Sequence, residues 1–261
     1  MIRLIGLLLC LILLNFAALS AFNDVEKWQQ AGNKAIAYLK HPDNVLNTQT
    51  YLLYSFLDRK FELPKLGKSI DAETIFKPGS PYTVFRRLFD GNYNLHKKDI
   101  DSLKNAIDRM TLYAIYCDKF PLAPNYFEVM DTLAKKNGYY LTHALWACRL
   151  LEENSCLSTR ELAQLKTLKN KLATEIVNML EAGGFFNDIK IEALAMLYYS
   201  GMSHHIKPQW IDRIVEAQRD DGGWFRTIKN TKTNGATTVL ALWVLMEALH
   251  NETKAVSMMF R

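Results

Sequence analysis

Residues 214–224 read Ile-Val-Glu-Ala-Gln-Arg-Asp-Asp-Gly-Gly-Trp. We expect a helix to end in this stretch, because Gly222 and Gly223 accept the positive φ angles that are common just past a helix C-terminus. Trp224 is then placed to fold back onto the preceding helix. The side-chain amide of Gln218 is placed to hold the turn by hydrogen bonds. The stretch therefore predicts a helix end, a tight turn and an aromatic plug in one unit.

This unit resembles the QW repeat of the α/α-toroid superfamily. That superfamily includes squalene and terpenoid cyclases, protein prenyltransferase β subunits and several secreted carbohydrate-active enzymes. The residues that carry the resemblance are Gln218, Asp221, Gly222, Gly223 and Trp224. The resemblance implies helical hairpins whose inner helices surround a central cavity. It implies little about the reaction, because one architecture hosts many chemistries.

Nearly every other segment also has a helical pattern, with apolar residues three and four positions apart. The sequence therefore predicts an all-α chain. The expected helices span about 23–39, 47–61, 99–117, 124–136, 140–153, 158–181, 190–200, 207–219 and 236–250. Between them, residues 62–93 contain three prolines and three glycines, and we expect a long irregular connection there.

Internal repetition supports the hairpin interpretation. The segment 137–146 matches 234–243 in its Asn-Gly pair and its Ala-Leu-Trp triplet, at an offset of 97 for both. Ala193 and Leu194 lie between the copies, 49 residues after one and 48 before the other. A full toroid of six such hairpins needs roughly 290 residues. We therefore expect residues 21–261 to form one domain, either an incomplete ring, in effect a small α/α barrel, or a ring closed by 62–93.

The first twenty residues predict a secretory signal peptide. Arg3 precedes an apolar run over 4–16, and small residues follow. A retained N-terminal anchor is the alternative. Cleavage leaves a protein that we expect to be secreted or periplasmic, with no membrane span of its own.

Three cysteines remain after residue 20, namely Cys117, Cys148 and Cys156. An oxidising compartment permits one disulfide and one free thiol among them, and the pairing stays open. Cys148 lies within an apolar helical pattern and is predicted to be a buried, inert thiol. No spacing in the chain resembles a metal site, and no cofactor-binding motif is found.

The charge balance does not indicate a nucleic-acid partner. The chain carries a formal net charge of +5, and loss of Arg3 leaves 31 basic against 27 acidic residues. The lysines are scattered or lie in short groups without interleaved aromatic residues, which is typical of solvated helix faces.

The repeat register suggests where chemistry occurs. His143 and Glu192 hold equivalent positions on adjacent inner helices, near the ends that open on the cavity. An imidazole beside a carboxylate is a suitable acid–base pair. The alternative is a structural tie between two packed helices.

Four further residues near the same helix starts are candidates for ligand binding: Tyr139, Tyr140, Asp188 and Asn234. Tyrosines and polar groups at the rim of a cleft suit sugar rings, which need stacking surface and paired hydrogen bonds. For Asp188 and Asn234 the alternative is helix capping.

These observations support three functional hypotheses. The first is an exported toroid-like protein that binds a polar ligand such as a glycan in its cleft, with cleavage of that ligand left open. The second is a non-catalytic helical scaffold that binds a protein or peptide. The third is a terpenoid-binding relative, which requires an apolar, aromatic-walled cavity. It would lack the Asp-x-Asp-Asp acid of the cyclases, because no such run occurs.

Overall fold

The computed structural model describes residues 24–44, 46–66, 75–76, 80, 82–250 and 256–259. All regular secondary structure in these ranges is helical, which confirms the all-α prediction. The predicted signal peptide lies outside the described residues. After a helix over 24–40 come α2 (Thr48–Phe61), η1 (Thr83–Leu88), α4 (Lys97–Asp101), α5 (Ala106–Ile115), α6 (Tyr126–Ala134), α7 (Tyr139–Asn154), α8 (Thr159–Glu181), α9 (Asp188–Tyr199), η2 (Ser203–His205), α10 (Pro208–Glu216) and α11 (Gly235–Leu249).

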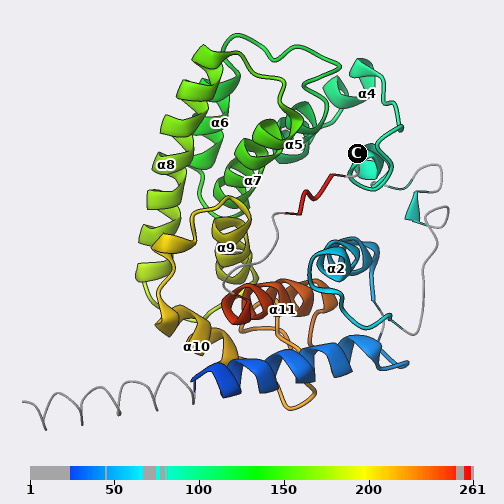
Figure 1. The fold of residues 1–261 in the computed structure, drawn as a ribbon, viewed down its shortest axis with the longest axis vertical. Coiled ribbons are helices and arrows are strands. Elements are labelled where there is room, and N and C mark those ends of the chain that lie inside the picture. The colour runs from blue at the N-terminus through cyan, green and yellow to red at the C-terminus, as the bar shows by residue number, and fades with distance from the viewer. Residues whose placement is uncertain are drawn as a thin grey trace, which may run out of the picture.

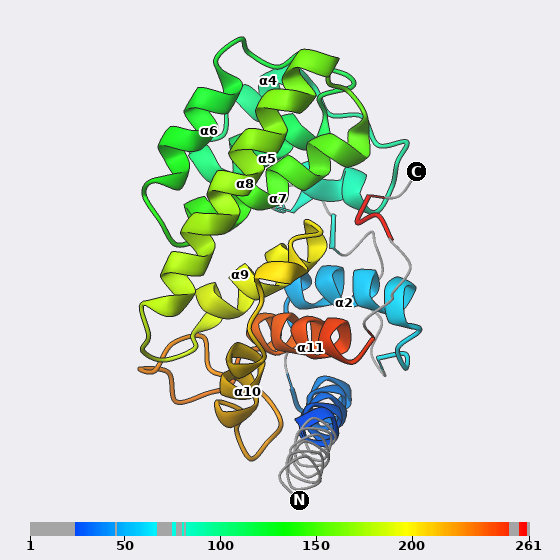
Figure 2. The same ribbon diagram turned by 60° about the vertical axis from the view of Figure 1, so that its left-hand side comes forward.

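The helices form an inner and an outer layer. The inner helices α5, α7, α9 and α11 pack side by side in that order, and α11 then contacts α2, so that these five helices form an arc (Figure 1). On the outside, α6 and α8 cover α7, and α8 continues to α9 (Figure 2). The 24–40 helix lies beside α10 and α11. There the Trp28 Nε1 donates a hydrogen bond of 2.9 Å to the Asp212 Oδ1.

The sequence of each helix explains its layer. In α11, 13 of the 15 residues are buried, from Ala236 to Ala248, and α9 buries ten of its 12. A helix that is apolar on all sides has to be covered on all sides, so these two lie in the inner layer. By contrast, α8 buries only seven of its 23 residues, along one stripe, and lies outside.

The QW-like turn joins α10, α11 and the 24–40 helix. The side-chain amide of Gln218 donates hydrogen bonds of 2.9 Å to the carbonyls of Ala31 and Gly222. The indole of Trp224 is 1% exposed, and its Nε1 donates to the Ile214 carbonyl at 2.8 Å. The predicted fold-back of Trp224 onto α10 and the tie by Gln218 are therefore both confirmed.

The two glycines of this turn are needed for different reasons. Gly222 has a φ of +87°, and a Cβ there would lie 2.4 Å from the Lys34 carbonyl oxygen. The positive φ predicted for Gly223 is wrong: a Cβ there would meet the Cβ of Thr233 at 2.9 Å, so close packing excludes a side chain. Asp221 supports the turn by accepting from the Gly223 amide at 3.0 Å and the Thr233 hydroxyl at 2.8 Å.

Comparable turns precede the other two repeated helices. Asn137 and Gly138 have positive φ angles before α7, and Gly183 and Gly184 have them before α9. Residues with positive φ thus stand in the connections before α7, α9 and α11 alike.

Some predicted boundaries were wrong. The single helix expected over 99–117 is divided into α4 and α5. Asn105 begins a new helix there because its side chain accepts a hydrogen bond from the Ile107 amide at 2.9 Å. The connection 62–93 contains the short helix η1. The remaining predicted helix ends differ from the observed ones by up to three residues.

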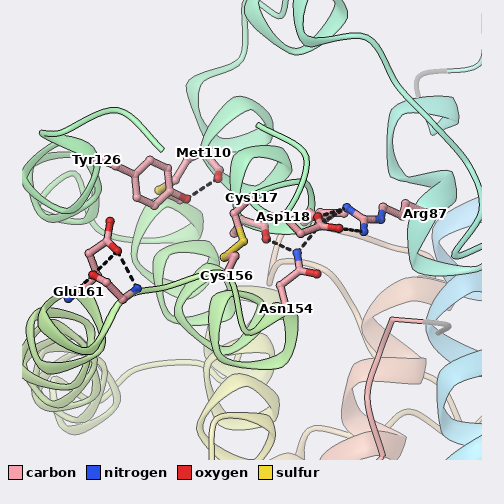
Figure 3. Close-up of a disulfide and its surroundings, with 11 residues drawn as sticks. Arg87, Met110, Cys117, Asp118, Tyr126, Asn154, Cys156 and Glu161 are labelled. Atoms are coloured by element: carbon pink, nitrogen blue, oxygen red, sulfur yellow. Dashed lines mark hydrogen bonds and ion pairs between the residues drawn. A yellow bond between two sulfur atoms is a disulfide. The ribbon is translucent and has the colours of Figure 1, made fainter. Parts of the chain in front are cut away.

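A disulfide joins Cys117 and Cys156, which follow the C-terminal ends of α5 and α7 (Figure 3). Beside it, the Asn154 side chain donates to the carbonyls of Ala114 and Ile115 at 2.9 and 2.6 Å. These bonds fix α5 and α7 to each other at one end. Cys148 is a buried free thiol whose pKa is raised well above its ordinary value by burial, as predicted for an inert cysteine.

Candidate functional site

A pocket of about 240 Å³ lies inside the arc of inner helices. Its lining comes from α2, η1, α5, α7, α9 and α11, together with one residue of the 256–259 segment. Most of the wall is apolar and much of it aromatic. This part of the lining includes Leu52, Leu53, Tyr82, Phe85, Leu88, Phe89, Trp146, Met196, Leu240 and Met258.

His143 and Glu192 face each other in this pocket. The His143 Nε2 lies 3.8 Å from the Glu192 Oε1, and both residues belong to the lining. The sequence prediction that α7 and α9 bring these two side chains together is confirmed. The separation exceeds a hydrogen bond, so the pair is close without being bonded directly.

Each member of the pair has a hydroxyl neighbour. The Thr142 hydroxyl donates a hydrogen bond to the Glu192 carboxyl, and the Thr111 Oγ1 lies 3.4 Å from the His143 Nδ1. These contacts orient both side chains. The His143 side chain remains 23% exposed and that of Glu192 9%.

Burial sets the protonation of the pair. It lowers the pKa of His143 to about 4 and raises the pKa of Glu192 to about 8, because an apolar surrounding disfavours the charged form of each. The Thr142 hydrogen bond partly opposes the rise for Glu192. At neutral pH the imidazole is therefore uncharged and the carboxyl protonated, and their contact is between two neutral groups.

Asp108 is a second acid in the same pocket, which sequence reasoning missed. It lies in the first turn of α5, lines the pocket, and has a pKa raised by burial. The repeat register that identified His143 and Glu192 does not extend to α5. The sequence therefore carries no signal that places Asp108 beside them.

Tyr139 and Asp188 do not line the pocket. The Tyr139 hydroxyl donates to the Asp188 Oδ2 at 2.5 Å, and the Thr237 hydroxyl donates to the Asp188 Oδ1 at 2.5 Å. These three residues are 49 positions apart in sequence and lie in the first turns of α7, α9 and α11. They tie the three inner helices together at one end. Arg226 adds a bond of 3.2 Å to the Tyr139 hydroxyl.

The other two predicted rim residues have local contacts. Asn234 caps α11, where its side chain accepts from the Thr237 amide at 3.0 Å, which confirms the capping alternative. For Asp188 that alternative is wrong, because Asn187 is the N-cap of α9. Tyr140 is half-buried, and the Lys136 Nζ lies 5.0 Å from its ring centroid. The role of these residues in ligand binding stays a prediction.

Among the described residues, no group of three His, Cys, Asp or Glu side chains is arranged to hold a metal ion.

No helix in the described ranges is both long and apolar enough to cross a membrane.

No family profile, no curated protein and no solved structure matches this chain.

Proposed function

We propose that the central pocket binds a small, uncharged and largely apolar molecule through one oxygen atom, which Glu192 and His143 hydrogen-bond. The observation that carries this proposal is the position of the two polar side chains, 3.8 Å apart in a wall that is otherwise mainly apolar. Apolar pockets with a few convergent polar groups are the common form of small-molecule sites.

The chemistry of the pair favours an uncharged ligand. With both groups neutral at pH 7, neither supplies the countercharge that a buried ionic ligand needs, and burying an unpaired charge is costly. Burial also disfavours the charged form of Asp108, whose pKa is raised. The protonated Glu192 carboxyl is a hydrogen-bond donor for a carbonyl, ether or hydroxyl oxygen. A raised pKa of this kind keeps a carboxylic acid able to donate a proton at neutral pH.

The same pair supports acid–base catalysis as the reaction class. Glu192 holds a proton and can act as the acid, and the unprotonated imidazole of His143 can act as the base, a weak one because burial lowers its pKa. Protonation of the bound oxygen by Glu192 would leave a carboxylate, and a proton taken from the ligand would leave an imidazolium beside it. The two charges would then stabilise each other at close range.

The fold and the location are part of this proposal. We infer an α/α-toroid arrangement from the QW-like turn, the equal hairpins and the arc of inner helices around a pocket. The chain is too short for six hairpins, and residues 82–89 supply the part of the pocket wall that a further hairpin would provide. Export to an oxidising compartment, as a secreted or periplasmic protein, is supported by the Cys117–Cys156 disulfide.

Among the three hypotheses, the lining favours an apolar ligand like that of a terpenoid-binding protein. A glycan needs exposed polar groups, whereas the polar groups of Tyr139 and Asp188 hydrogen-bond to each other and to Thr237. The glycan and the protein- or peptide-scaffold hypotheses stay predictions, and each becomes an outcome of the binding experiment.

We expect the uncharged fluorophore N-phenyl-1-naphthylamine to bind the mature protein and 1-decanol to displace it. The variant Leu53→Trp fills the pocket from α2, so we expect affinity to fall by roughly tenfold or more, since the probe loses buried apolar area. Leu162→Trp makes the same change on the exposed face of α8 and is the matched control. Fluorescence titration measures both affinities.

Two results would overturn this proposal. One is equal probe affinity in Leu53→Trp and in the unchanged protein. The other is tight binding of a soluble oligosaccharide such as maltohexaose, blocked by Leu53→Trp, with no displacement of the probe by decanol. The second result would restore the glycan hypothesis. Binding of extended peptides without any small-molecule binding would restore the scaffold hypothesis.

A further inference from the structure

The 256–259 segment is held at the end of the pocket opposite the acid–base pair. Asp108, His143 and Glu192 lie in the first two turns of their helices. The residues that contact 256–259 lie in the last turns: Glu153 of α7, Tyr199 of α9 and Arg59 of α2. In Figure 1 this segment is drawn in red, in the middle of the molecule between α2 and α7.

Three helices of the arc hydrogen-bond to this short segment. The Ser257 hydroxyl donates to the Glu153 Oε2 at 2.7 Å, and the Met258 amide donates to the Tyr199 hydroxyl at 3.0 Å. The Arg59 guanidinium donates to the Met258 carbonyl at 3.1 Å. A segment with no regular structure of its own is thereby fixed by side chains from α7, α9 and α2.

The groups that hold it are themselves buried and interconnected. Glu153 is 8% exposed and Tyr199 6%, and the Tyr199 hydroxyl lies 2.8 Å from both carboxylate oxygens of Glu153. The Arg149 Nε also donates to Glu153, at 3.1 Å. Buried polar groups of this kind need partners, and the 256–259 segment supplies several of them.

We propose that the 256–259 segment is the floor of the central pocket and that Met258 sets the pocket's depth. Met258 is the residue of this segment that lines the pocket, and its side chain is 4% exposed. The part of this inference that concerns ligand length rests on the proposed binding of an apolar molecule. A ligand whose oxygen is held at Glu192 extends its apolar part toward Met258, so this side chain determines the longest ligand that fits.

The first test measures access to the pocket without any ligand. Met196 of α9 lines the pocket, so Met196→Cys places a thiol there, and methyl methanethiosulfonate is a small uncharged reagent for it. We expect Met258→Ala to raise the rate of modification roughly tenfold, because the thiol loses its cover. Met259→Ala is the matched control: Met259 is equally buried but lines a different cavity, beside Arg87 and Asp90.

The second test uses linear primary alcohols from hexanol to tetradecanol as probes. In the unchanged protein, affinity should rise with each added carbon up to a limit, by roughly fourfold per methylene. Met258→Ala should move that limit to chains longer by about two or three carbons, since the substitution removes that many chain atoms from the floor. Met259→Ala should leave the limit in place.

The outcomes separate the floor from the binding proposal. Unchanged thiol reactivity in Met258→Ala, or an equal rise of the modification rate in Met259→Ala, would overturn the proposal that the 256–259 segment is the floor. Failure of every alcohol to bind would reject the proposed function, and the thiol rates would still decide whether Met258 closes the pocket. An unchanged length limit despite faster thiol modification would overturn the role of Met258 in setting depth.

Discussion

Replacement of Trp224 by alanine is expected to lower the free energy of unfolding by about 3–5 kcal/mol, the usual cost of removing a large buried aromatic side chain. The indole is 1% exposed, and its Nε1 satisfies the Ile214 carbonyl at the end of α10. Loss of the ring leaves a cavity and removes one of two hydrogen bonds to this carbonyl, since the Ala217 amide also donates to it, at 3.1 Å. Chemical denaturation, followed by circular dichroism, measures the change.

Two variants separate the contributions. Trp224→Phe keeps much of the packing and loses the hydrogen bond, so its cost should be smaller. Phe225→Ala truncates the neighbouring aromatic residue, which is only partly buried, and serves as the control. A loss below about 1 kcal/mol for Trp224→Ala would show that the turn does not brace the fold, since that is the average effect of any substitution.

The second large effect is a loss of stability between pH 6.5 and 8, on the order of 2 kcal/mol. Burial raises the pKa of Glu192 from 4.5 in the unfolded chain to about 8. Between these values the folded protein holds a proton that the unfolded chain has released. Folding therefore takes up a proton, and its free energy becomes less favourable as the pH rises.

His143 acts in the opposite direction at lower pH. Its pKa is lowered from 6.5 to about 4, so below pH 6.5 the unfolded chain gains a proton that the folded protein does not hold. Stability due to His143 thus falls as the pH is lowered from 6.5 to about 4. The two contributions offset each other between about 4.5 and 6.5, and Glu192 dominates in the window from 6.5 to 8.

Glu192→Gln keeps the shape of the protonated acid and removes its titration. Denaturation curves at pH 6.5 and 8 should therefore show a smaller loss in this variant than in the unchanged protein. The difference between the two is the contribution of Glu192. His143→Gln, which should change the loss in this window by only about 0.4 kcal/mol, is the control. An identical loss in Glu192→Gln would mean that Glu192 is already ionised at pH 6.5.

Local patterns predicted the helices and the QW-like turn, because both depend on near neighbours in sequence. The three- and four-residue apolar spacing identifies helices, and glycines with an aromatic residue identify the turn at 222–224. The division of the predicted 99–117 helix was missed because Asn105 serves equally well inside a polar helix face and as a cap. Only its hydrogen bond to Ile107 distinguishes the two.

The repeat register reached further, since equal spacing places residues on equivalent turns. It correctly predicted that His143 lies next to Glu192. It could not show which equivalent side chains would satisfy one another, and so Tyr139 and Asp188 were expected at an open rim, whereas they bond within the helix layer.

Other parts of the pocket lie outside the repeat. Asp108, residues 82–89 and Met258 come from segments with no repeat register. Their contacts depend on how the chain closes around the pocket, which no local pattern encodes. The pairing of Cys117 with Cys156 is of the same kind, because the two follow different helices, 39 residues apart.

The central claim is that the pocket binds an uncharged apolar ligand beside a neutral acid–base pair, and a matched pair of ligands tests it most directly. Decanol and decanoate have tails of equal length and differ in charge at pH 7. Competition with N-phenyl-1-naphthylamine gives both affinities. We predict that decanol binds at least about a hundredfold more tightly, because the pocket offers a carboxylate no countercharge. Equal or tighter binding of decanoate would contradict the account.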